Sequence, residues 1–223
     1  SVTFYPDDTI FETVEFKADI IKKKLKETAF LNKGLKINFV DENTGEEKSY
    51  EEKDGIKSYV KYINREAEVI NDEVVYVEGE SGDIEVEAAF QYTNGYSEQI
   101  NAYCNRINVI DGGTLVTGFK TALTRVMNQY ARELGYLKGK DDNFDGKDIR
   151  NGIVAIISIK HPDPQFEGQT KSKLGTPQAK TAVEAVVSEK LSFWLEENRN
   201  QSDTLVRKML KASLARIAAR KAR

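Results

Sequence analysis

The sequence predicts an α+β protein in which a mixed sheet is combined with several long helices. Three observations carry this prediction. Four stretches repeat apolar residues every three or four positions, as amphipathic helices do, and shorter stretches alternate or are continuously apolar, as strands do. Both hairpin-like turns and long helical connections occur between the strands. The chain has 223 residues, of which 39% are hydrophobic, enough for one large domain or two small ones with a buried core.

Helices are expected where apolar stripes run between cap residues. The first ends near Gly34, a glycine C-cap pattern, and a later one begins with Thr176 as N-cap and Pro177 at the first helical position. The last helix has a thin apolar stripe and a strongly cationic remainder, so it is expected to project from the body. The four expected helices are 16–32, 117–135, 176–198 and 202–223, and a shorter helix is expected at 55–64.

Strands are expected between these helices. Residues 152–160 form a near-continuous apolar run, typical of a central strand that is covered on both faces. A separate hairpin is expected from 35–41 and 47–53. Three further segments are expected as successive antiparallel strands joined by tight turns: 73–79, 83–93 and 97–109.

Charge is distributed unevenly, although the net charge is only −3. Residues 41–90 hold sixteen acidic side chains against five basic ones, and no acidic residue follows Asp203. The last helix therefore carries seven basic side chains and no acidic one after Asp203, which suits contact with a phosphate backbone. Aromatic residues do not interleave these cations, so duplex DNA, contacted without reading its sequence, is expected rather than single strands. The expected DNA contacts are Lys208, Lys211, Arg216, Arg220, Lys221 and Arg223.

Single residues and missing patterns exclude several classes of site. Cys104 is the only cysteine, which excludes an internal disulfide and suits a reducing, cytoplasmic location. His161 is the only histidine, so a histidine-based metal cluster or triad is excluded, and a structural role at a strand end is expected. Residues 141–152 begin like a calcium loop but end in Gly152, where a glutamate is needed; no metal site is predicted, and Asp145 is expected to cap a short helix. No apolar run reaches the ~18 residues of a membrane span, and no secretion leader is expected.

The segment "PQFEGQTKSKLG", residues 164–175, connects the apolar strand to the next helix. Lys171 carries a flexible charge that can reach a phosphate oxygen, and Gln169 and Thr170 add neutral donors. The chain has no glycine-rich phosphate motif and no evident catalytic glutamate with a magnesium ligand. Taken alone, these residues therefore predict half of a phosphate site.

Several segments together resemble the transducer domain of the DNA gyrase B protein, which is the ATPase component of a bacterial type IIA topoisomerase. "DPQFEGQTKSKLG" is very close to the Q-T-K loop of that family, and "DGGTLVTGFKTALTR" follows its G-G-T segment. "FLNKGLKINFVDENTGEEKSYEEKDGIKSYVKYIN" and the basic end "ARIAARKAR" follow two further family patterns. The resemblance covers nearly the whole chain.

The resemblance implies the fold of domain 2 of ribosomal protein S5, with a left-handed βαβ crossover and a long basic C-terminal helix. It implies that residues 1–10 end a preceding GHKL-type ATPase domain, that 11–200 form the transducer domain, and that 201–223 lead to the DNA-cleavage core. The implied partners are the DNA gyrase A protein, in a heterotetramer, the upstream ATPase domain and duplex DNA.

The resemblance also implies a role for the lysine loop. Gln169, Thr170 and Lys171 match the loop that contacts the γ-phosphate of ATP in the preceding domain, and Lys171 is implied to stabilise the transition-state charge. ATP and Mg²⁺ are then cofactors of the full-length protein, with the general base outside this chain, which is expected to be inactive alone. Loss of the γ-phosphate would release the loop and let the two domains rotate.

This chain departs from the family around Gly112-Gly113, where T-H-E-G-G-T-H is common. Ile110 and Leu115 replace the two histidines. A glycine pair before a helix is by itself a weak candidate for an anion site. Topoisomerase IV, whose equivalent domain shares the Q-T-K loop, stays an alternative, as does an S5-like nucleic-acid-binding module without nucleotide chemistry.

Overall fold

A computed structural model of the protein describes residues 1–222, so Arg223, one of the expected DNA contacts, lies outside the described residues. The chain divides into two compact units, Ser1–Gly55 and Ile56–Arg223. None of the helices within residues 1–222 combines the length and the apolar character that crossing a membrane requires.

The first unit contains one helix and one hairpin. α1 (Ala18–Leu31) ends before Gly34, whose φ of +81° suits glycine just beyond a helix end. β1 (Lys36–Asp41) pairs antiparallel with β2 (Glu46–Glu51). The helix and the hairpin expected in this part of the sequence are both confirmed.

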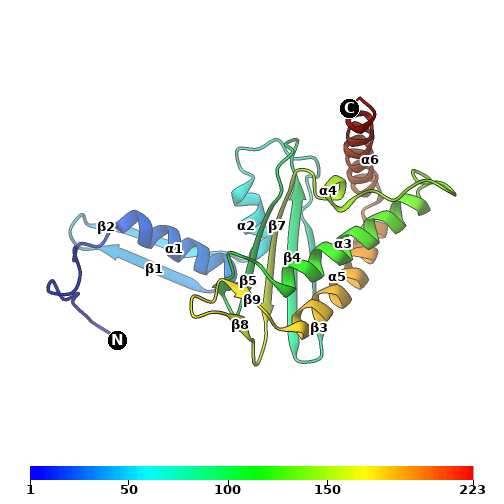
Figure 1. Ribbon diagram of the computed structural model, residues 1–223. Helices are drawn as coiled ribbons and strands as arrows, with labels where there is room; N and C mark the ends of the chain where they lie inside the picture. Colours follow the sequence, from blue (N-terminus) through cyan, green and yellow to red (C-terminus); the bar gives the residue numbers. More distant parts are fainter. Residues whose placement is uncertain (223) are drawn as a thin grey trace. The chain divides into compact units, whose positions relative to one another are not determined.

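The second unit is built on a five-stranded mixed sheet with the strand order β3-β4-β7-β5-β6 (Figure 1). β7 (Ile153–Lys160) lies in the middle, antiparallel to β4 (Ile84–Tyr92) and parallel to β5 (Gln99–Cys104). β3 (Val75–Ser81) and β6 (Ile107–Asn108) form the two edges. The central place of β7 confirms the prediction from its apolar run.

Helices cover both faces of this sheet. α3 (Thr114–Glu133) and α5 (Pro177–Glu197) pack on one another and on the sheet, and α2 (Ile56–Ile63) packs on β4 and β7. Neighbouring residues of β7 face different layers: Ile157 belongs to the core cluster that contains α3 and α5, whereas Ile156 is equally buried but lies outside that cluster. β7 is therefore buried on both faces.

One predicted strand pairing is wrong. β4 and β5 are consecutive in the sequence, but β7 lies between them and pairs with both. The prediction assumed a hairpin, and it fails because β5 runs parallel to β7, which requires a crossover through α3. The predicted strand 97–109 is also divided, because Asn105 and Arg106, with φ values of +50° and +67°, turn the chain into β6.

A short helix and a long helix complete the second unit. α4 (Gly146–Ile149) begins after Asp145, which occupies the predicted N-cap position. The backbone N–H of Asp145 donates to Asp148 Oδ2 at 3.0 Å, as in a capping box. α6 (Arg199–Lys221) follows α5 directly (Figure 1). Most side chains of its last turns are exposed. Only these last turns fit the expected projection, since four residues of the first half are buried: Ser202, Leu205, Val206 and Met209.

Candidate functional site

The lysine loop is the tip of a short hairpin that the sequence does not predict. β8 (Phe166–Glu167) pairs antiparallel with β9 (Lys173–Leu174), and residues 168–172 form the tip between them (Figure 1). Strands of two residues leave no periodic pattern, which is why the sequence indicates only a loop.

The tip turns sharply and presents its side chains outward. Gly168 has a φ of +83° and Lys171 a φ of +53°, and the Lys171 N–H donates to Gly168 O at 3.3 Å. The side chains of Gln169, Thr170 and Lys171 are all exposed. Within residues 1–222 Lys171 forms no ion pair with a carboxylate, and its ammonium lies 5.6 Å from the ring centre of Phe166. An exposed cation without a carboxylate partner suits contact with an external anion.

The base of the hairpin, in contrast, is held firmly. Leu174 is fully buried, and Gly175 N donates to Gln165 O at 2.8 Å. Gln165 N donates to Thr176 Oγ1 at 2.7 Å. Thr176 thus occupies the predicted N-cap position of α5, but its hydroxyl bonds to the hairpin base instead of to the helix.

The glycine pair before α3 is covered by this hairpin and is not an open anion site. Leu174 N donates to Gly112 O at 3.0 Å, and Asp111 N donates to Ser172 O at 2.8 Å. Gly113 and Leu174 form an isolated parallel bridge. The turn is therefore a packing contact between the start of α3 and the lysine hairpin.

The two residues that replace the family histidines lie in different surroundings. Leu115 is fully buried in the core, whereas Ile110 is 79% exposed. An apolar side chain at 115 therefore adds to the core, while nothing in the structure explains an apolar side chain at 110.

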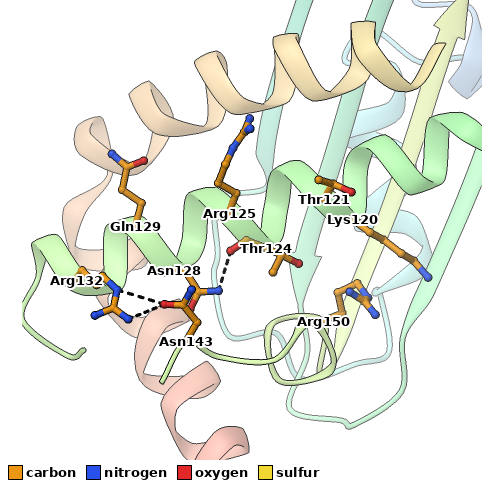
Figure 2. A pocket seen from close by; sticks show the side chains of 9 residues that line it. All are labelled: Lys120, Thr121, Thr124, Arg125, Asn128, Gln129, Arg132, Asn143 and Arg150. Carbon is orange, nitrogen blue, oxygen red and sulfur yellow. Dashed lines mark hydrogen bonds between the residues drawn. The ribbon is translucent and has the colours of Figure 1, made fainter. Parts of the chain in front are cut away.

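A second candidate site, not identified from the sequence, is a groove of about 690 Å³ along α3 (Figure 2). Threonine and amide side chains line it between the charged groups. Lys120 and Arg150 lie toward one end in Figure 2, and Arg132 and Asn143 lie toward the other. Its four cations are Lys120, Arg125, Arg132 and Arg150.

Glu98 partly neutralises one end of this groove. Lys120 Nζ lies 2.7 Å from Glu98 Oε1, and Arg150 Nε lies 2.9 Å from Glu98 Oε2. Partial burial pushes the pKa of Glu98 upward, but the hydrogen bonds from Lys120 and Arg150 outweigh it and hold the pKa below its usual value. At the other end Arg132 donates to Asn143 Oδ1 at 2.7 Å, a neutral partner. Within residues 1–222, Glu98 is the one carboxylate that forms ion pairs with these four cations, so the lining carries an excess of positive charge.

The cations of α6 that were expected to contact DNA lie in two different settings. Arg216 donates through Nε to Asp148 Oδ1 and through Nη2 to Asp148 Oδ2, both at 2.9 Å, and its Nη1 lies 3.1 Å from Asp145 Oδ2. Lys208 Nζ donates to Gly95 O at 3.2 Å, and burial lowers the pKa of Lys208. Among the members of the set within residues 1–222, Lys211, Arg220 and Lys221 are exposed, and Arg220 Nη2 lies 3.9 Å from Asp145 Oδ2.

The remaining titratable candidates take structural positions. His161 follows β7; its backbone N–H donates to Asn105 Oδ1 at 2.9 Å, and its Nδ1 accepts the Asp163 N–H at 3.0 Å. Cys104 is fully buried, and burial raises the pKa of its thiol to about 11, so it is protonated at neutral pH. Residues 1–222 contain no group of three or more His, Cys, Asp or Glu side chains placed to hold a metal ion.

Comparison with known proteins identifies the class to which this fold and this loop belong. A sequence model of the family described as DNA gyrase B matches residues 55–223. The chain therefore belongs to the DNA gyrase B family.

The relatives include B proteins of both kinds of bacterial type II topoisomerase. The DNA topoisomerase 4 B protein of Bacillus subtilis (strain 168) is 50% identical over 222 residues, which cover 99% of this chain and 34% of that protein. The DNA gyrase B protein of Clostridium acetobutylicum is 47% identical over 223 residues, which cover 100% of this chain and 35% of that protein. The chain thus spans about one third of the length of these relatives.

Solved structures agree with this family and with the mixed α+β architecture. The 43K ATPase domain of Thermus thermophilus gyrase B, in complex with an aminocoumarin, superposes with a TM-score of 0.89 and 40% identity, covering 97% of this chain and 58% of that chain. The ATP-binding domain of Francisella tularensis topoisomerase IV gives a TM-score of 0.80 and 26% identity, covering 95% of this chain and 57% of that chain.

Proposed function

We propose that this chain is the transducer region of a type II topoisomerase B protein, which couples ATP binding and hydrolysis in a preceding GHKL-type domain to DNA strand passage and, in a gyrase, to supercoiling. The observation that carries the proposal is the exposed tip at Lys171, a cation that no carboxylate of the described chain neutralises. A lysine held outward on a buried hairpin base suits the γ-phosphate of a nucleotide bound by another domain.

The remainder of the ATP site is proposed to lie elsewhere in the full-length protein. Residues 1–222 hold no cluster of acidic or histidine side chains that would bind Mg²⁺. In the proposal, ATP and Mg²⁺ bind the preceding domain, Gln169 and Thr170 add donors, and Lys171 stabilises the charge that develops on the γ-phosphate. The chain without that domain is then inactive toward ATP.

Duplex DNA is proposed as a second partner, contacted through phosphates. The groove along α3 adds its four cations to the exposed Lys211, Arg220 and Lys221 of α6. Lys208 and Arg216 are proposed as weaker contacts, because their charged groups are already bonded within the protein. A heterotetramer with the DNA gyrase A protein, or with its topoisomerase IV counterpart, in the cytoplasm completes the proposal.

The finer fold assignment is also proposed on the resemblance. β5, α3 and β7 form the parallel βαβ crossover that the S5 domain 2 fold contains, and its left-handed turn is part of the proposal. So is a division into residues 1–10, 11–200 and 201–223. Gyrase and topoisomerase IV stay equal alternatives, since identities of 47% and 50% do not separate them.

The test is a pair of lysine substitutions in the full-length protein. Lys171→Ala is expected to lower kcat for ATP hydrolysis about 100- to 1,000-fold, the range for loss of one preorganised donor. Lys173→Ala is the matched control, because Lys173 lies on the same hairpin but its Nζ is 3.0 Å from Glu167 Oε2. The control should lower kcat less than about threefold.

The same pair separates the proposal from its rival, a nucleic-acid-binding module without nucleotide chemistry. That rival is favoured by the cationic groove along α3. ATP turnover near the wild-type value in Lys171→Ala, together with salt-dependent duplex binding, would contradict the coupling role and favour the rival.

A further inference from the structure

We infer that Gly113 is a positioning residue for Lys171, because it locks the β8–β9 hairpin to the start of α3. The inference rests on the proposed function, in which Lys171 meets a terminal phosphate. The tip itself does not fix the direction of Lys171, since the tip side chains are exposed and its backbone bond from Lys171 N to Gly168 O is 3.3 Å long. The fixing contacts must therefore come from outside the tip.

Two backbone hydrogen bonds join the hairpin to the segment before α3, and they begin one residue after Lys171. Ser172 O accepts the Asp111 N–H at 2.8 Å. Gly112 O accepts the Leu174 N–H at 3.0 Å, and the parallel bridge of Gly113 with Leu174 follows. Because a hydrogen bond weakens steeply outside a narrow range of distance and angle, these contacts set the place of the tip relative to α3.

Position 113 accepts only glycine in this arrangement. Its φ of +110° and ψ of −150° lie in a region that residues with a Cβ avoid. A Cβ at Gly113 would lie 2.1 Å from Leu174 O and 2.7 Å from Leu174 N, which are backbone atoms without rotamers. Leu174 cannot retreat, because its side chain is fully buried in the core. A side chain at 113 must therefore displace β9 and the tip that it carries.

The test is a double-mutant cycle on ATP hydrolysis by the full-length protein. Gly113→Ala is expected to lower kcat about 10- to 100-fold, with a smaller change in KM, because a misplaced catalytic group costs that much. Added to Lys171→Ala, it should lower kcat by no more than about a further twofold, since it acts through Lys171. Losses that multiply in the double variant would show that Gly113 acts independently of Lys171, and the inference would be wrong.

Gly135→Ala is the matched control for backbone strain. Gly135 follows the other end of α3 with a φ of +80°, and a Cβ there has nothing within 4 Å. Its effect on kcat should stay below about threefold, and the loss should multiply with that of Lys171→Ala, because the two sites do not touch. A control as damaging as Gly113→Ala would assign the loss to strain alone and overturn the inference.

Hydrogen exchange on the unsubstituted protein decides the question even if Gly113→Ala does not fold. The amides of Asp111 and Leu174, which donate across the junction, should exchange at least about 100-fold more slowly than those of Gln169 and Thr170 in the tip. Equal rates would overturn the inference. Failure of the proposed function is distinguishable, because Lys171→Ala would then keep wild-type turnover while the exchange pattern persisted.

Discussion

Lys171 and Arg216 show opposite uses of a positive side chain in the same molecule. Lys171 stands on an exposed tip with no carboxylate beside it, whereas Arg216, 22% exposed, is held by Asp145 and by Asp148, which is only 4% exposed. Both lie within residues 160–223, where thirteen basic side chains stand against seven acidic ones, so composition alone does not distinguish them. Whether a basic side chain pairs within the protein or is available to an external anion therefore depends on the acidic side chains that the fold places beside it.

The surroundings of Arg216 and of Lys171 should differ most in how much they contribute to the stability of the fold. Asp148→Ala should lower the free energy of unfolding by about 2–4 kcal/mol. It removes the buried carboxylate that accepts hydrogen bonds from Arg216 and from the backbone N–H of Asp145 at the start of α4. Lys171→Ala should change it by less than about 0.5 kcal/mol. Urea unfolding measures both. Asp142 is an exposed acid in the same segment, so Asp142→Ala is the control and should change the free energy of unfolding by less than about 0.5 kcal/mol. Equal losses in Asp148→Ala and Lys171→Ala would show that the two sites do not differ in their contribution to stability.

A second prediction uses duplex DNA as the external anion. Lys211→Gln should reduce the slope of log affinity against log salt concentration by about 0.9, the value for one lost phosphate contact. Arg216→Gln should reduce it by less than half of that, because its charge is matched by Asp148 and Asp145. Fluorescence anisotropy titrations at several salt concentrations give both slopes. Identical reductions would show that Arg216 is as available to phosphate as an exposed lysine.

A smaller effect is expected for Glu98, which is partly exposed and forms ion pairs with two of the four groove cations, Lys120 and Arg150. Its folded pKa lies below the ordinary value of 4.5, so the ionised form stabilises the fold above that pH, and this stability is lost as the pH falls through the folded pKa. Glu98→Gln should cost about 0.5–1 kcal/mol at neutral pH after allowance for solvent screening. Unfolding curves between pH 7 and about pH 3 should show that the difference in free energy of unfolding between Glu98→Gln and wild type becomes smaller as the pH falls. A difference that does not change with pH would show that the ion pairs of Glu98 do not cause it.

Much of the fold could be predicted because its signals are local. Gly34 and Pro177 mark helix ends through their own backbone preferences, and the apolar run of β7 indicates burial on both faces. The pairing of β5 could not be predicted, because the alternating residue pattern of a strand next to a turn is the same whether the strand pairs with the preceding strand or with a later one. Only the parallel bond pattern with β7 reveals the crossover.

The candidate site divides in the same way. Gln169, Thr170 and Lys171 could be singled out because they are adjacent in the sequence. The contact of Gly113 with Leu174 could not, because it is a backbone bridge between segments 61 positions apart and depends on no side chain. The cationic groove could not be predicted for a related reason. Arg150 and Glu98 lie 52 positions apart, and no sequence pattern links the two positions.

The central place of β7 also sets a condition on synthesis of the chain. β4 ends at Tyr92 and β5 at Cys104, but the strand that separates them begins only at Ile153. A chain made only as far as residue 152 lacks β7, so β4 and β5 would each have an unpaired edge that can pair with another chain. Parallel, long-range pairing is slow to form, so the interval favours association between unfinished chains. Because β7 pairs with β4 on one side and with β5 on the other, adding residues 153–160 covers both of these edges.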